Sequence, residues 1–168
     1  MPKIIEHPER RLMEEARRQV EQNGYGGVTI RSVAVACGMG VGTVYNYFPS
    51  KDALLAAYLL QDWNRCKDEI YAAGAAAQTP EEVLRCIHDQ LLAYSTRHSR
   101  VFRDADAAAG FAGAFGPYHA MLRDQLAQPL LPFCTEPFAA EFAAEALLTW
   151  TMAGRTFDEI YALLSKLF

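Results

Sequence analysis

Apolar residues recur at intervals of three and four along most of the chain, which is the spacing of one face of a helix. A first helix is expected to open at Pro8 and to end at Gly24, since proline favours the first helical turn and glycine favours the position after the last. Two short helices are expected over residues 30–37 and 41–48, the first of them capped by Thr29. The amino-terminal part is therefore predicted to be a cluster of short helices.

Longer helices are predicted further along the chain. One begins after Ser50 and runs to about residue 73, followed by a linker of small residues over 74–78. The next begins at Thr79-Pro80-Glu81-Glu82, which has the spacing of a capping box. The helical pieces from there on are expected over 80–97, 100–109, 117–128, 138–153 and 156–167, with a flexible stretch over 107–116. Since only residues 28–30 have local strand character, the predicted fold class is all-α.

Charge is distributed unevenly along the sequence. The net charge of −4 and the pI near 5.6 by themselves argue against a nucleic-acid partner. Residues 1–55, however, hold seven basic and six acidic side chains, whereas the remainder holds nine basic and fourteen acidic ones. No acidic residue lies between Glu21 and Asp52, so this window would not repel a polyanion. Chance is the alternative explanation, and the window matters only if its residues form a suitable shape.

Several classes of protein are disfavoured by the sequence. No apolar run is long enough to span a bilayer, and the first residues lack the apolar segment of a signal peptide. The cysteines are widely spaced, which suits reduced thiols in a cytoplasmic protein better than a disulfide framework or a metal site: Cys37, Cys66, Cys86 and Cys134. No nucleotide-binding, metalloprotease or serine-hydrolase motif is present. We therefore expect no enzymatic activity, no metal and no cofactor.

The amino-terminal helices have the proportions of a helix-turn-helix. Gly38 lies in the turn before the third helix, where glycine adopts a positive φ without steric cost. The third helix presents Thr43, Tyr45, Asn46 and Tyr47 almost without charge, and hydroxyl and amide groups on such a helix can bond phosphates and base edges. The alternative is an ordinary helical corner in which the two tyrosines pack at the edge of the core.

Two stretches of this region resemble the TetR family of transcriptional regulators: GYGGVTIRSVA at residues 24–34 and GMGVGTVYNYFPSKDAL at residues 38–54. The turn, the hydroxyls, the aromatic pair, the Pro-Ser stop and the lysine all match the family's pattern. The resemblance implies a helix-turn-helix DNA-binding domain over residues 1–51. It also implies an effector-binding and dimerisation domain over 52–168, reached by a helix that runs from residue 51 to about 73.

The same resemblance implies a set of DNA contacts in the second and third helices. The residues concerned are Thr29, Tyr47 and Lys51 for phosphates, and Arg31, Gly42, Thr43 and Asn46 for base edges. Gly42 would act through the absence of a side chain. Tyr45 either contacts phosphate or packs beneath its helix. The family usually has Ser or Thr where this chain has Gly40, and glycine can still cap the helix but removes a possible phosphate contact.

The last two helices are predicted to form a dimer. Over residues 138–153 only Glu141, Glu145 and Thr149 make a polar stripe, so both flanks of that helix are expected to be buried, one of them against a partner. The alternative is that the chain's own core covers both flanks. Two such helices from each chain suit a four-helix bundle across a two-fold axis, an arrangement that the family also forms. The candidate interface residues are Phe138, Phe142, Ala143, Ala146, Leu147, Phe157, Ile160, Tyr161 and Leu164.

Large or polar residues on inward helix faces are candidates for a ligand pocket: Trp63, Cys66, Ile70, Cys86, Gln90, Tyr94, Phe102, Phe115, Tyr118, Met121 and Trp150. The alternative is that they are simply core. Because few of them are charged, a mostly apolar small molecule is expected. The resemblance thus implies a cytoplasmic homodimeric repressor that such a ligand releases from a palindromic operator. The alternative is a DNA-binding protein of the same fold that answers to a protein partner or organises the chromosome.

Overall fold

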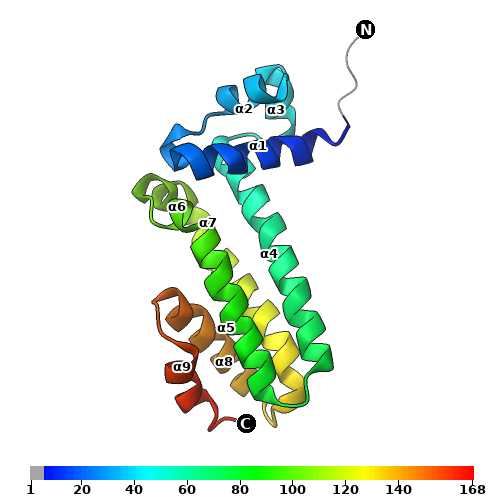
Figure 1. Cartoon of the computed structure of the whole chain (residues 1–168), viewed down its shortest axis with the longest axis vertical. Helices are drawn as coiled ribbons and strands as arrows, with labels where there is room; N and C mark the ends of the chain where they lie inside the picture. The colour runs from blue at the N-terminus through cyan, green and yellow to red at the C-terminus, as the bar shows by residue number, and fades with distance from the viewer. Residues whose placement is uncertain (1–5) are drawn as a thin grey trace. The chain divides into compact units, whose positions relative to one another are not determined.

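The structure, a computed structural model, describes residues 6–168, apart from the side chains of Ala114 and Phe115. All regular elements in this range are helical, which confirms the all-α class (Figure 1). In chain order they are α1 (Pro8–Asn23), the 3-10 turn η1 (Tyr25–Gly27), α2 (Ile30–Cys37), α3 (Val41–Tyr47), α4 (Lys51–Ala76), α5 (Pro80–Arg97), α6 (Ser99–Phe102), α7 (Ala105–Ala127), the 3-10 segment η2 (Gln128–Phe133), α8 (Pro137–Met152) and α9 (Phe157–Leu164).

The predicted helix caps are confirmed. Each capping oxygen accepts a hydrogen bond from the backbone N–H three residues later, at 2.9 Å for Thr29, 3.0 Å for Ser50 and 3.4 Å for Thr79. These bonds satisfy backbone donors that the first turn of a helix leaves without an internal partner. The starts of α2, α4 and α5 are therefore set by local sequence.

Two expected interruptions are helical instead. α4 continues through Gly74 to Ala76, so most of the segment expected as a linker is its last turn. α7 runs without a break through residues 107–116 and past Pro117. Alanine, the best helix former, stands at five of those ten positions, while a proline removes only one backbone donor. Counting glycines overestimated the flexibility of this stretch.

The described chain divides into two compact units, and each has its own core. Unit 1 comprises Met1–Asp62 and His98–Ala112, and unit 2 comprises Trp63–Arg97 and Gly113–Phe168. The boundary expected between residues 51 and 52 falls inside unit 1. In unit 1, α1 packs on α2, α2 packs on α3, and α6 contacts α1 (Figure 1). This packing encloses Leu12, Ala16, Val33 and Val44.

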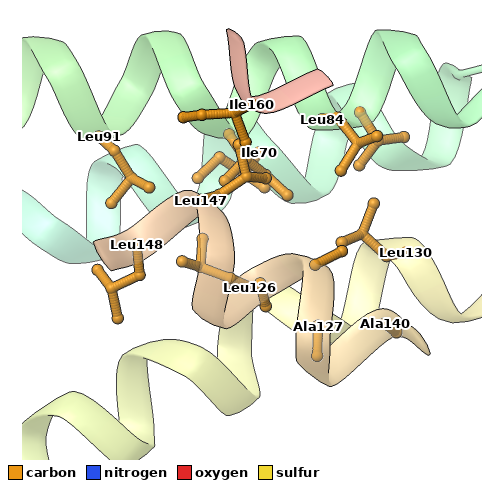
Figure 2. Close-up of a cluster of buried hydrophobic side chains, with 14 of the residues drawn as sticks. Ile70, Leu84, Leu91, Leu126, Ala127, Leu130, Ala140, Leu147, Leu148 and Ile160 are labelled. Carbon is orange, nitrogen blue, oxygen red and sulfur yellow. The ribbon is translucent and has the colours of Figure 1, made fainter. Parts of the chain in front are cut away.

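Unit 2 is built around α5, which packs on α8 and α9. Figure 2 shows leucine, isoleucine and alanine side chains from these helices and from α4, α7 and η2 meeting in one cluster. Leu84, Leu126, Leu130 and Leu147 are completely buried there. Burial of each such side chain contributes about 1.5–3 kcal/mol, so the cluster supplies most of the drive to fold unit 2.

We predict that Gly74→Ala destabilises unit 2, although alanine normally improves a helix. A Cβ atom at position 74 would lie 2.7 Å from the Cβ of Pro129, and overpacking of this kind costs about 1–3 kcal/mol. Gly113→Ala, where a Cβ atom has no neighbour within 4 Å, is the matched control and should gain up to ~1 kcal/mol. Urea denaturation measures both changes. Equal gains for the two variants would contradict the close approach of α4 to η2.

Candidate nucleic-acid interface

The turn between α2 and α3 depends on a left-handed backbone conformation at Gly38. This residue has φ 66° and ψ 33°, as expected from the sequence, and its N–H donates to the carbonyl of Val35 at 3.1 Å. The N–H of Met39 then donates to the carbonyl of Ala34 at 2.9 Å. The chain thus leaves α2 along a fixed path, and α3 begins two residues later.

Helix α3 is attached to unit 1 along one edge only. Of its seven residues, Val44 alone is buried, and Phe48 adds a second buried side chain just beyond its end. Every other residue of α3 is exposed: Val41, Gly42, Thr43, Tyr45, Asn46 and Tyr47. Tyr45 is 51% exposed, so it does not pack beneath the helix.

The polar groups of this surface have no partner within the described chain. Neither Thr43, Tyr45, Asn46 nor Tyr47 makes a side-chain hydrogen bond to another residue of the range 6–168, and the same holds for Arg31 at the start of α2. Exposed hydroxyl, amide and guanidinium groups without internal partners are free to bond an external one. Val41 was absent from the expected contacts, although its position on the exposed edge follows from helical spacing around Val44.

Thr29 and Gly40 lie at the two helix starts that border this surface. The Thr29 hydroxyl oxygen accepts from the N–H of Ser32, which leaves its own hydrogen available to a further acceptor. Gly40 precedes α3 with φ −69° and ψ 143° and provides no side-chain cap. These angles are ordinary for any residue, so the family's usual Ser or Thr would fit there without backbone strain.

Lys51 is held in place by Tyr25. Its Nζ lies 3.6 Å from the centroid of the Tyr25 ring and donates to the Tyr25 carbonyl oxygen at 3.3 Å. The Tyr25 hydroxyl in turn donates to the Asp52 carboxylate. Burial, together with the charge of Asp52, raises the pKa of Tyr25 to about 12. Since one of the three Lys51 donors is used, two remain for an external anion.

Nearby charges on α1 are largely neutralised within that helix. Three of its arginines form ion pairs with glutamates one turn away, at 2.5–2.8 Å: Arg10 with Glu14, Arg17 with Glu21 and Arg18 with Glu15. The cations that border α3 in sequence are therefore Arg31 and Lys51. Across the described range, no cluster of three metal-ligating side chains occurs, and none of the helices is both long and apolar enough to cross a bilayer.

The residues expected at a dimer interface fall into two groups. Ala143, Leu147, Phe157, Ile160 and Leu164 are buried in the core of unit 2, because they lie on the faces of α8 and α9 that pack against α5 and each other. Ala146 and Tyr161 are partly buried. Phe138 and Phe142 are 63% and 52% exposed, and Trp150 and Met152 of the same helix are exposed as well. The exposed apolar surface of α8 thus keeps Phe138 and Phe142 of the expected residues and adds Trp150 and Met152.

The residues expected to line a pocket are also spread over different environments. Trp63, Cys66, Ile70 and Tyr94 are buried in unit 2, and Cys86, Tyr118 and Met121 are partly buried there. Gln90 is partly buried and donates to Glu69 at the surface, because its side chain leaves the core side of α5. Trp150 is exposed on α8, and Phe102 is exposed in unit 1. The side chain of Phe115 lies outside the described residues.

Comparison with known proteins matches this region to the family of bacterial regulatory proteins called the tetR family, over residues 12–58. The transcriptional repressor KstR of Mycolicibacterium smegmatis is 31% identical over 108 residues, which cover 59% of this chain and 53% of KstR. The matched part of this chain spans about half the length of KstR, both in this organism and in Mycobacterium tuberculosis. The similarity thus includes all of the helix-turn-helix.

Solved structures of the family share the fold over nearly the whole chain. A TetR-family transcriptional regulator from Pectobacterium atrosepticum superposes with a TM-score of 0.68 at 19% identity, over 95% of this chain and 89% of the other. The repressor FadR from Thermus thermophilus, solved with lauroyl-CoA, gives 0.61 at 21% identity, over 95% and 92%. Residues 12–58 thus match the tetR family of bacterial regulatory proteins, and the chain has the fold of TetR-family regulators.

Proposed function

We propose that the chain is a cytoplasmic, sequence-specific DNA-binding repressor of transcription, active as a homodimer on a palindromic operator. The observation that carries the proposal is the exposed face of α3, whose hydroxyl and amide groups have no partner in the described chain. In a helix-turn-helix, the helix that follows the tight turn lies in the major groove of DNA. In this chain that helix is α3. Asn46 and Thr43 would then meet base edges.

The contacts to the DNA phosphate backbone are assigned to four residues in and around α3. For Lys51, the contacts with Tyr25 restrict its ammonium group, which lowers the entropy lost when it binds a phosphate. Tyr47 and Tyr45 offer exposed hydroxyl donors, and Thr29 keeps one hydroxyl hydrogen free at the start of α2. Such contacts fix register and orientation on the duplex without specifying sequence.

The homodimer proposal rests on the exposed face of α8. Phe138 and Phe142 lie one turn apart on it, Trp150 follows two turns further on, and Leu163 of α9 is 68% exposed. A group of large exposed apolar residues is unusual for a monomer, and a two-fold axis lets each chain cover the other with the same surface. Five of the residues first expected at the interface would instead support this face from beneath.

Two polar side chains on this face, Glu145 and Thr149, are already bonded within the chain. The Glu145 carboxylate accepts hydrogen bonds from His119 at 2.9 Å and from the Thr149 hydroxyl at 2.9 Å. The bond to His119 holds the pKa of Glu145 below its usual value. Because burial costs a carboxylate more when it is unpaired, these bonds make it easier for a second copy to cover α8 at Glu145.

A mostly apolar effector is proposed for the interior of unit 2. Trp63 donates from Nε1 to Gln125 at 2.7 Å, and its ring meets Tyr94 edge to face at 5.6 Å between centroids. Burial raises the pKa of Tyr118 on α7. Large aromatic surfaces with a few fixed polar groups are typical of sites for lipophilic ligands. The lauroyl-CoA bound to Thermus thermophilus FadR makes long-chain acyl compounds a reasonable first set to screen.

The DNA-binding function is tested by mobility shift with the DNA that flanks the gene for this chain. We expect a saturable shift that unlabelled flanking DNA removes and random DNA of equal length does not. Asn46→Ala should lose this preference but keep weak binding, because its phosphate contacts remain. Equal competition by the two DNAs, at all salt concentrations, would contradict a sequence-specific regulator.

Gly42→Leu should weaken DNA binding without weakening the fold. A Cβ atom at position 42 meets no atom within 4 Å, and leucine favours a helix more than glycine does by up to ~1 kcal/mol. The larger side chain would nevertheless hold α3 away from the groove floor. We expect an affinity loss of at least ~1–3 kcal/mol, the worth of one base contact, with an unchanged or higher melting temperature. Unchanged affinity would place α3 outside the groove.

Lys51→Met should lower affinity for every sequence alike. It should also reduce the slope of log K against log salt by about 0.9 for each protomer, because one phosphate contact per protomer is lost. Lys51→Arg should retain the slope. Lys67→Met, which removes a partly exposed lysine from the middle of α4, is the matched control for loss of charge. An unchanged slope for Lys51→Met would refute the phosphate assignment.

Phe142→Glu should convert the dimer to a monomer at micromolar concentration. The side chain is exposed in the single chain, so the fold tolerates the charge, while the dimer would bury it without a partner. Leu92→Glu on α5 replaces another exposed apolar residue and should leave the assembly intact. Sedimentation equilibrium distinguishes the two. A wild-type monomer at the same concentration would rule out the proposed interface.

Effector binding should quench or enhance the fluorescence of Trp63, and Trp63→Phe should lose part of that change. If a ligand releases DNA, saturating operator must weaken the ligand's affinity by the same factor, since coupling between two sites is reciprocal. Titration of a ligand found by thermal-shift screening, with and without operator, measures this factor. Equal affinities would contradict release by that ligand.

A further inference from the structure

The exposed surface of α3 contains no charged side chain of the kind that recognises G·C pairs. Arginine or lysine gives guanine the paired donors for its O6 and N7, and Asp or Glu accepts from the amino group of cytosine. No Arg, Lys, Asp, Glu, Gln or His occurs between Val41 and Tyr47, and no acidic residue occurs between Glu21 and Asp52. The hydroxyls of Thr43, Tyr45 and Tyr47 are donor and acceptor at once, so they do not favour one pair.

The groups that α3 does present match A·T pairs. The Asn46 amide offers one donor and one acceptor, the combination that pairs with the N7 and N6 of adenine. Val41 is 37% exposed in the first turn, and Thr43 adds a second exposed methyl group. Apolar contact with the C5 methyl group is what distinguishes thymine in the major groove.

The local geometry lets these groups come close to the base edges. Gly42 lies between Val41 and Thr43 and has no side chain, and the space around it is open to 4 Å. Recognition helices place the residues of their first turn against base edges, so the two methyl groups lie where the helix approaches the groove most closely. A cation able to read guanine stands outside α3, at Arg31 in the first turn of α2.

We propose that the part of each half-site read by α3 consists of A·T pairs. In this proposal Val41 contacts a thymine methyl group, Asn46 bonds an adenine, and recognition of guanine is confined to the base pair that Arg31 reaches. The proposal rests on the DNA-binding function proposed above and specifies its substrate. It makes the operator a palindrome with a group of A·T pairs in each half-site.

The first step of the test is selection of duplexes from a random library by the wild-type full-length chain. Repeating the selection with Asn46→Ala and Thr43→Ala identifies the positions read by α3, as those where base preference is lost. We expect A·T pairs at these positions and a loss of at least fivefold in affinity for Asn46→Ala. G·C pairs there would overturn the inference and leave the proposed function standing. Failure to enrich any sequence would instead count against the proposed function itself, on which the inference rests.

The second step replaces single thymines of the selected half-site by uracil, which removes only the C5 methyl group. At one position the wild type should bind about fourfold more weakly, the worth of one buried methyl group. Val41→Ala should bind the thymine and uracil duplexes equally. Val35→Ala removes a valine that is 73% exposed on α2 and should keep the full preference for thymine. Absence of a uracil effect at every thymine, or its persistence in Val41→Ala, would overturn the assignment of Val41.

Discussion

Burial of Val44 is the contact on which the rest of the surface depends. A seven-residue helix is too short to be stable in water, because so few hydrogen bonds cannot offset the cost of nucleation. α3 persists since Val44 is completely buried in unit 1, Phe48 follows it into the core, and the turn at Gly38 fixes the approach of the chain. Two buried side chains and one turn therefore allow the other six residues of α3 to remain exposed.

Contacts within unit 1 also restrict the side chain of Lys51 before DNA binds. A lysine is flexible, and ordering it against a phosphate costs rotamer entropy of about 1.5–2 kcal/mol. Contact with the Tyr25 ring restricts the side chain before any DNA is present, and the bond between Tyr25 and Asp52 restricts the ring. Part of the rotamer entropy of Lys51 is thus lost during folding rather than on DNA binding. This suits a side chain that must contact a phosphate in any DNA sequence.

The sequence predicted the helix starts and the turn that depend on interactions between neighbouring residues. The caps at Thr29 and Ser50 and the turn at Gly38 follow from side-chain oxygens and backbone freedom within three residues, and the structure confirms them. The close approach of α4 at Gly74 to Pro129, by contrast, joins residues 55 apart, and no local pattern contains it.

The candidate sites divide in the same way. The candidate residues of α3 came from the resemblance to the TetR family, but the contact of Lys51 with Tyr25 joins residues 26 apart and gives no sequence signal. On α8 the sequence predicted that both flanks would be covered, but it did not indicate which flank faces the chain's own core. The structure decides this, since Ala143 and Leu147 turn toward α5 while Phe138 and Phe142 turn outward.

The most direct test of the account is an NMR titration of the isotopically labelled chain with the duplex it selects. The account predicts that the largest shifts occur at the backbone amides of Gly42, Thr43 and Asn46 and at the side-chain amide of Asn46. Within unit 2, by contrast, the amides buried around Leu84 and Leu147 should change little. Large shifts confined to unit 2, with the α3 amides unchanged, would contradict the claim that α3 is the surface that meets DNA.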